Sequence, residues 1–310
     1  LRTAARADEV RAALRPHRPA DTERADKLQV VTLDLGSDEG WEAALQGSDV
    51  LIHTASPFPL VQPSNEDVLI RPAVDGTLRA LRAAHKAGIT RVILTSSAVA
   101  VMNTDLPAGR TEYGEEDWTD LAHPTATAYV KSKTEAERAA WDFVRTEAPE
   151  IALTTINPGL VVGRPLDTNY GTSLQLVERI LRGKDPMLPR IGFPVVDVSD
   201  VARMHVLAME TPETAGRRLI AAESFLWFTE TAEILNAAFP ARRIPTRQAP
   251  DFFIRMLGLF DKSVGTIVGS LGLRTDLDST PARELLGIEF IPAADSLRSS
   301  AEFLIETGRV

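Results

Sequence analysis

Short apolar runs rich in β-branched residues alternate with longer helical stretches over much of the chain. The runs predict buried strands at residues 28–33, 49–53, 91–97 and 151–156. The stretches between them predict helices at residues 41–46, 68–87 and 129–147. Strands that alternate with helices build βαβ units, so the pattern predicts an α/β fold with a doubly wound parallel sheet.

The alternation stops after about residue 163, where turns and prolines become more frequent. Helical patterns then dominate to the end of the chain, which predicts a smaller, mostly helical C-terminal lobe. We therefore divide the chain into residues 1–163 and residues 164–310. Residues 193–211 combine an apolar run with a helical pattern, and we expect them to return to the first part.

A tyrosine and a lysine lie four residues apart at the start of the helix predicted at 129–147. Positions i and i+4 share one face of a helix, so Tyr129 and Lys133 are expected to be neighbours. A lysine ammonium beside a phenol lowers the tyrosine pKa, which suits a general acid or base. Ser96 and Ser97 end the apolar strand that precedes this helix, where a hydroxyl can polarise a carbonyl group. The structural alternatives are a turn at the serines and an ordinary amphipathic helix.

Composition narrows the class of protein. The 310 residues include 34 Lys and Arg against 43 Asp and Glu, and a net charge of −9 makes nucleic acid an unfavourable partner. The absence of cysteine excludes disulfides, zinc–thiolate sites and thiol nucleophiles, and the histidines lack metal-ligand spacing, so we expect no metal. No apolar run approaches the roughly 20 residues that span a bilayer, and no secretory signal opens the sequence, so we expect a cytoplasmic protein that does not bind membranes.

Taken in order along the chain, the motifs resemble those of the extended short-chain dehydrogenases/reductases of the NAD-dependent epimerase/dehydratase superfamily. Within that group the sequence is most similar to the dihydroflavonol 4-reductase-like branch. The segments that carry the resemblance are residues 1–6, 34–35, 53–57, 74–77, 95–98, 129–133, 157–163, 196–202 and 278–287. The resemblance implies a Rossmann-like dinucleotide-binding domain at 1–163 and a substrate-binding lobe at 164–310.

The resemblance also implies roles for individual residues. Ser97 would bind the substrate carbonyl, Tyr129 would supply the proton, and Lys133 would lower the pKa of that tyrosine and hold the nicotinamide ribose. Ser96 is the alternative to Ser97, because sequence alone does not separate the two. The residues expected to bind the cofactor are Arg6, Asp34, Leu35, Thr54, Ala55, Ser56, Thr95, Ser96, Tyr129, Lys133, Pro158, Gly159 and Val161. The loops expected to line the substrate pocket contain Phe58, Met102 and Asn103.

The residue that follows the second strand of this fold indicates whether the cofactor is NAD or NADP. NAD binders place a carboxylate after that strand, whereas an arginine there suits the 2′-phosphate of NADP. The resemblance places Arg6 at this position, so NADP is favoured and NAD is the alternative, with Asp8 two residues too late for a strand-end carboxylate. The family's first strand and glycine-rich turn do not occur in the sequence. We expect the natural chain to be longer by roughly 30 residues, and the alternative is a protein that has lost this element and with it part of its cofactor site.

The favoured function is therefore NADP-dependent reduction of a ketone or aldehyde, such as a dihydroflavonol-like carbonyl, with a small molecule as the partner. One alternative is an NAD-dependent nucleotide-sugar epimerase or dehydratase, and another is a non-catalytic cofactor-binding protein on the same scaffold. The helical stretches at residues 80–87 and 136–144 are rich in alanine, and the resemblance implies a homodimer through these helices. The alternative is that they pack against the sheet of their own chain.

Overall fold

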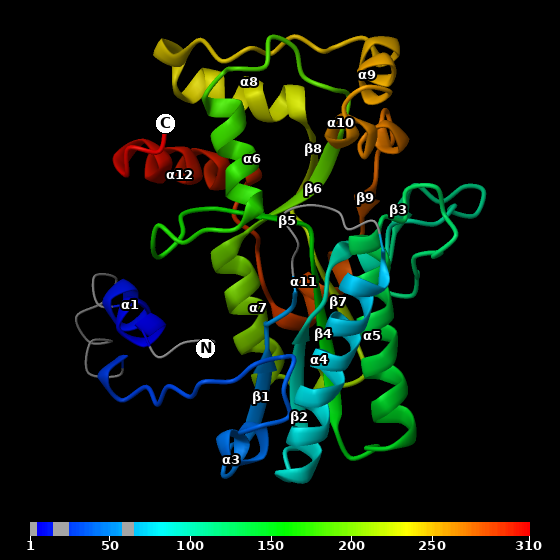
Figure 1. Cartoon of the computed structure of the whole chain (residues 1–310), viewed down its shortest axis with the longest axis vertical. Helices are drawn as coiled ribbons and strands as arrows, with labels where there is room; N and C mark the ends of the chain where they lie inside the picture. Colours follow the sequence, from blue (N-terminus) through cyan, green and yellow to red (C-terminus); the bar gives the residue numbers. More distant parts are fainter. Residues whose placement is uncertain (1–4, 15–24, 58–64) are drawn as a thin grey trace.

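The computed structural model describes residues 5–14, 25–57 and 65–310. Its centre is a parallel sheet in the order β1-β2-β4-β7. The four strands are β1 (Val50–His53), β2 (Arg91–Thr95), β4 (Ala152–Pro158) and β7 (Arg218–Ala221). The predicted doubly wound α/β fold is confirmed, and β1, β2 and β4 begin and end within two residues of the predicted bounds (Figure 1).

Both faces of this sheet are covered by helices, which explains why its strands are apolar runs rather than alternating ones. Val92 and Leu94 of β2 pack with α4 (Asp67–Lys86) and α5 (Ala128–Thr146) on one face, where α3 (Trp41–Leu45) adds Trp41. Ile93 points to the opposite face, which is covered by α7 (Val198–Glu210) and α11 (Thr280–Leu286). The period of two along β2 thus divides the core between the two helical layers.

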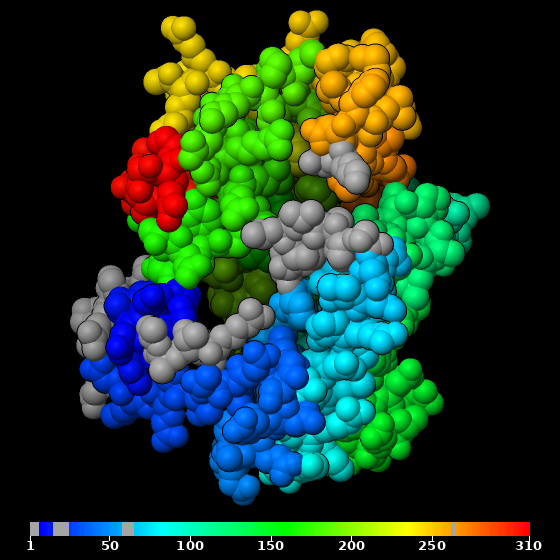
Figure 2. All heavy atoms as spheres, viewed as in Figure 1, coloured from blue at the N-terminus to red at the C-terminus, as the bar shows by residue number. Residues whose placement is uncertain are grey.

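A second unit stands on the carboxyl ends of these strands (Figure 1). Its sheet joins β5 (Leu160–Val162), β6 (Gly192–Asp197) and β8 (Ser224–Trp227), with β5 and β6 parallel and β8 antiparallel to β6. The helices of this unit are α6 (Thr172–Leu181), α8 (Phe228–Ala238), α9 (Asp251–Gly258), α10 (Lys262–Gly265) and α12 (Ala293–Glu306). A short pair of β3 (Glu112–Tyr113) with β9 (Asp276–Leu277) links the two units, whose surface is recessed between them (Figure 2).

Two predicted strands are wrong. Residues 28–33 form no strand, and the side chains of Leu28 and Val31 are 44% and 43% exposed. A strand must satisfy its backbone groups by pairing, and in the described ranges β1 pairs only with β2, so these residues join no ladder. Ala5 and Arg6, expected to end a strand, instead open helix α1 (Ala5–Leu14), which contains four alanines and one β-branched residue. Alanine, arginine, glutamate and leucine are strong helix formers, and here this local preference decides the structure.

Among the described residues, no helix combines the length and the apolar composition required to cross a membrane.

Candidate active site

The candidate site lies where β2 and β4 end and α5 begins. After β2, Ser97 has an extended backbone and caps a single 3₁₀ turn, with its Oγ accepting a hydrogen bond from the Val99 backbone N–H at 3.4 Å. Thr127 caps α5 in the same manner through the backbone N–H of Val130. These two caps fix the strand end and the first turn of the helix, and the hydroxyls of Ser97 and Tyr129 are hydrogen-bonded across the gap.

Tyr129 and Lys133 are neighbours on α5, with the Lys133 Nζ 5.9 Å from the centre of the tyrosine ring. Burial raises the pKa of Tyr129, and the hydrogen bond from Ser97 lowers it by less. The predicted net lowering of this pKa is therefore wrong for the structure, because removal of the phenolate from water outweighs its stabilisation. Burial also lowers the pKa of Lys133 to about 8, so the ammonium is still mostly charged at neutral pH.

His53, the last residue of β1, lies close to the lysine. Its imidazole is buried and contacts the indole of Trp41 edge to face, with the ring centres 6.4 Å apart. Burial lowers the pKa of His53 to about 4, and the positive charge of Lys133 adds to this effect. Its Nε2 has no hydrogen-bond partner within the described ranges. A neutral imidazole with an unused nitrogen beside a lysine is a polar group that a bound molecule could satisfy.

Thr95, the last residue of β2, and the two serines that follow it point in three different directions. Thr95 faces α7, where its Oγ1 lies 2.7 Å from His205 Nε2. Ser96 points behind the site and donates to the buried carboxylate of Glu137. Ser97 alone of the three is hydrogen-bonded to Tyr129, so the geometry separates two serines that the sequence left equivalent.

A small cavity of about 380 Å³ lies against this pair, lined by Ser96, Ser97, Tyr129, Pro158, Gly159 and Val161 together with the start of α6. Six residues predicted from separate sequence motifs, five of them as cofactor contacts, thus meet at one place. Gly159 is required there, because a Cβ at this position would stand 2.3 Å from the carbonyl oxygen of Pro194.

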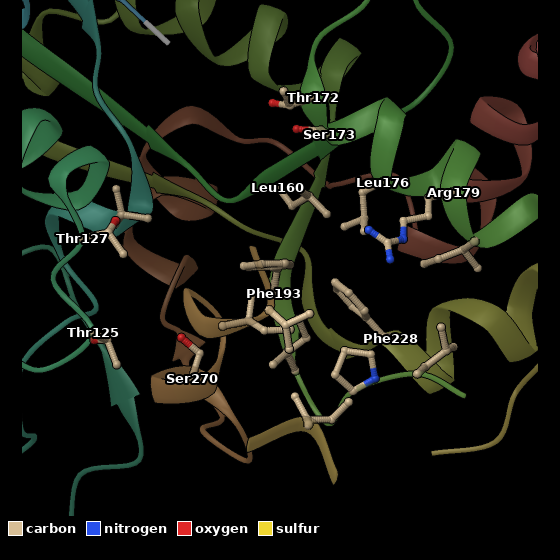
Figure 3. A pocket seen from close by; sticks show the side chains of 18 of the residues that line it. Thr125, Thr127, Leu160, Thr172, Ser173, Leu176, Arg179, Phe193, Phe228 and Ser270 are labelled. Carbon is tan, nitrogen blue, oxygen red and sulfur yellow. The ribbon is translucent and has the colours of Figure 1, made fainter. Parts of the chain in front are cut away.

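A larger pocket of about 920 Å³ adjoins this cavity and shares Ser97 and Tyr129 with it. Met102 and Asn103, predicted to line a substrate pocket, are part of its wall, whereas Phe58 lies outside the described residues. Most of the wall is apolar and comes from the second unit, including Leu176, Phe193 and Phe228 (Figure 3). The rings of Phe193 and Phe228 pack 5.8 Å apart.

Sequence reasoning missed this apolar wall. Its members, among them Leu160, Leu176, Phe193, Phe228, Phe253, Ile254 and Ile267, lie in different helices, strands and loops of the second unit. In sequence they are indistinguishable from core residues, so only the fold brings them together. Among the described residues of the wall, Arg179 is the one strong cation, and its guanidinium donates to the Asp185 carboxylate at 2.6 and 3.0 Å.

The remaining predicted cofactor residues lie apart from this centre or on its margin. Thr54, Ala55 and Ser56 follow β1 at the same sheet edge as Ser97, with Thr54 and Ala55 exposed. Asp34 is exposed, whereas the Leu35 side chain packs against α4 at Gly76. Arg6 pairs with Glu9 on its own helix and lies 4.0 Å from Asp167. The argument for NADP from a strand-end arginine is therefore wrong, because Arg6 is on a helix.

The chain resembles several known proteins. A model of the NAD dependent epimerase/dehydratase family matches residues 2–221. A cinnamoyl-CoA reductase of Medicago truncatula is 33% identical over 230 residues, which are 73% of this chain and 69% of that protein. An anthocyanidin reductase of Vitis vinifera is 30% identical over 233 residues, which are 71% of this chain and 68% of that protein.

A solved structure supports the same relationship. The crystal structure of a yeast methylglyoxal/isovaleraldehyde reductase complexed with NADPH superposes with a TM-score of 0.79. The sequence identity is 25%, and the match covers 100% of this chain and 91% of the yeast chain. The relatives named here are reductases, which bears out the prediction of an oxidoreductase.

Proposed function

Because the chain belongs to the NAD-dependent epimerase/dehydratase family, we propose that it reduces a ketone or aldehyde that carries a bulky apolar group, with NADPH as the hydride donor. The predicted resemblance to extended short-chain dehydrogenases/reductases is thereby confirmed. The observation that carries the proposal is the hydrogen-bonded pair of Ser97 and Tyr129, which lines both a small cavity and a large, mainly apolar pocket.

The residues around the small cavity fit the nicotinamide end of the cofactor. Pro158 and Gly159 line the cavity together with Tyr129. Next to that tyrosine, Lys133 offers a charged donor, and close to the lysine His53 offers a buried nitrogen that has no partner among the described residues. When bound, a reduced nicotinamide supplies the hydride. The choice of NADPH rests on the relatives, since the yeast structure contains NADPH, and no longer on Arg6.

The proposed roles of the chain's own residues follow from their positions. Ser97 Oγ donates a hydrogen bond to the carbonyl oxygen and holds it beside the phenol of Tyr129. Burial keeps Tyr129 protonated at neutral pH, so its hydroxyl can donate a proton as negative charge develops on that oxygen. The Lys133 ammonium then stabilises the phenolate that remains.

The large pocket supports the substrate class. A cavity of about 920 Å³ with phenylalanine and leucine side chains on its wall matches an aromatic or branched apolar body, which includes a dihydroflavonol-like ketone. The charged diphosphate of a nucleotide sugar would lose hydration against such a wall, which disfavours the epimerase alternative. A homodimer and a cytoplasmic location stay predictions.

The test is a carbonyl-dependent oxidation of NADPH, followed by its absorbance, with a panel of aromatic, branched aliphatic and small carbonyls. We expect turnover with the bulky apolar members. The Tyr129→Phe variant should bind NADPH as the wild type does, measured by nicotinamide fluorescence, while its kcat falls by a factor of about 10² to 10⁴. Equal rates for the two proteins would overturn the proposal.

A further inference from the structure

A buried carboxylate lies behind the candidate site and has no place in the mechanism above. Glu137 is one helical turn beyond Lys133 on α5 and is 1% exposed. Its two oxygens accept hydrogen bonds from the side chains of Ser96, Trp141, Thr155, Asn157 and Arg218. Five donors from four elements of structure converge on this one group, which no sequence motif singled out.

We propose that Glu137, paired with Arg218, is a positioning residue. It holds the Ser97 hydroxyl at hydrogen-bonding distance from the Tyr129 hydroxyl, so that both can bind the carbonyl oxygen during proton transfer. The inference rests on the proposed function. Glu137 acts through other residues and has no direct contact with the reacting atoms in this scheme.

The connection to Ser97 runs along two short paths. Ser96, the preceding residue, donates its hydroxyl to Glu137 Oε2. Asn157 Nδ2 donates to the same oxygen at 2.8 Å and to the backbone carbonyl of Ser97 at 3.2 Å. The side chain of the preceding residue and the backbone carbonyl of Ser97 itself are therefore both linked to one carboxylate, so a shift of Glu137 would rotate or translate the Ser97 hydroxyl.

Arg218 extends the same support to the loop in front of α5. Its Nε lies 2.6 Å from Glu137 Oε1, and its Nη1 donates to the carbonyls of Glu115 at 2.9 Å and Asp117 at 2.5 Å. The guanidinium also stacks on the ring of Trp118 at 3.7 Å. A planar group with fixed donors suits this arrangement, because it bridges the strand β7, the helix α5 and the loop without freedom to rotate.

Stability alone is a weak reason for this ion pair. Taking two charges out of water costs free energy that their attraction only partly repays, and apolar residues of similar size can fill such a place equally well. A carboxylate with several directional donors instead fixes the geometry of its neighbours. Displacements of about 1 Å in a catalytic group can cost roughly a hundredfold in rate, so such fixing has functional value.

The test compares Glu137→Gln with Glu135→Gln, a matched change on the same helix whose carboxylate is half exposed and pairs with Arg138. We expect Glu137→Gln to lower kcat by a factor of about 10 to 100 with KM for NADPH within twofold, and Glu135→Gln to change neither. Equal kcat for Glu137→Gln and Glu135→Gln would overturn the proposal.

A second readout does not depend on turnover. The chain has three tyrosines, so carbon-13 labelling of their Cζ atoms gives three resonances, of which Tyr129 is identified by its loss in Tyr129→Phe. Displacement of Ser97 weakens its hydrogen bond to the phenol, so the Tyr129 resonance should move in Glu137→Gln and stay in place in Glu135→Gln. An unchanged Tyr129 resonance in Glu137→Gln would contradict the inference, even in a protein that turns over no carbonyl.

A double variant separates an effect on catalysis from an effect on stability. Glu137→Gln leaves the Arg218 guanidinium without its carboxylate, which can destabilise the chain, whereas Glu137→Gln with Arg218→Met removes both charges. We expect the double variant to unfold near the wild-type temperature and to keep the low kcat and the shifted Tyr129 resonance. Recovery of wild-type kcat in the double variant would show that Glu137 has only a structural role. Absence of wild-type turnover, by contrast, would contradict the proposed function alone.

Discussion

The surroundings of Tyr129 differ between a buried network of hydrogen bonds and a mainly apolar pocket. Behind it, Ser96, Glu137, Asn157 and Arg218 are buried and joined by directional hydrogen bonds. In front of it, the pocket of about 920 Å³ has a mainly apolar wall, including a pair of phenylalanines that contact by their rings. The polar side can determine where Ser97 and Tyr129 stand, and the apolar side can determine what reaches them. Changes behind the tyrosine should therefore alter kcat, and changes in front of it should alter KM.

The largest effect after loss of Tyr129 itself should come from Lys133→Met. The ammonium beside the phenol stabilises the phenolate formed by proton donation, so we expect kcat to fall by a factor of about 100. Because the pKa of Lys133 is lowered to about 8, its charge is present at neutral pH and is lost as the pH rises through 8. The kcat/KM of the wild type should therefore decline above pH 8, measured in steady-state assays from pH 6 to about pH 10.

Lys131→Met provides the control for this change. Lys131 lies two residues earlier on α5, and its ammonium pairs with Glu66 at 2.8 Å. The Lys131→Met variant should keep the wild-type kcat and the decline of kcat/KM above pH 8. The Lys133→Met variant should lack that decline. A decline near pH 8 that persists in Lys133→Met would assign the titration to another group.

A smaller effect is expected on the apolar side. Phe193→Ala removes a ring that packs against Phe228 and lines the pocket, which should cost about 1 to 2 kcal/mol of substrate binding. The KM for a bulky apolar carbonyl should rise about tenfold, while kcat and the KM for a small aldehyde change by less than about threefold. Steady-state kinetics with one bulky and one small carbonyl measure this difference.

Phe252→Ala is the matched control, since this phenylalanine on α9 is 71% exposed. The same number of atoms is removed, and no change in KM is expected. If Phe193→Ala lowers kcat for both carbonyls instead, the two sides of Tyr129 are not independent and the comparison fails.

The sequence was informative where chemistry depends on local spacing. Tyr129 and Lys133 are neighbours because a helix brings i and i+4 together, and Ser97 is at the sheet edge because an apolar strand ends there. Hence three of the four central strands, the helices α4 and α5, and Tyr129, Lys133 and Ser97 (with Ser96 as its alternative) can be predicted from the sequence, whereas β7 cannot. Their roles in catalysis stay predictions until they are measured.

Other features depend on contacts between residues that are far apart in the sequence, and no local pattern predicts such contacts. The pocket wall unites residues from Met102 to Ile267, which are apolar like any core residue. Glu137 was missed because a glutamate in a helix is usually exposed, and its burial follows from the position of Arg218 on β7. The strand at 28–33 was wrong because β-branched residues favour a strand only where a partner strand is present.

The smallest effect concerns Arg6, where the sequence and the structure disagree. The resemblance implied a strand-end arginine that binds the 2′-phosphate of NADP, which predicts a large loss of NADPH affinity in Arg6→Ala. In the structure Arg6 lies on α1, pairs with Glu9 and lies near Asp167, and partly exposed ion pairs of this kind contribute about 1 kcal/mol or less. We therefore expect Arg6→Ala to change the ratio of NADPH to NADH dissociation constants by less than about threefold, measured by nicotinamide fluorescence, with Arg11→Ala on the same helix as control. A tenfold or greater loss of NADPH preference in Arg6→Ala but not in Arg11→Ala would show that Arg6 binds the cofactor. It would then follow that α1 moves when NADPH binds.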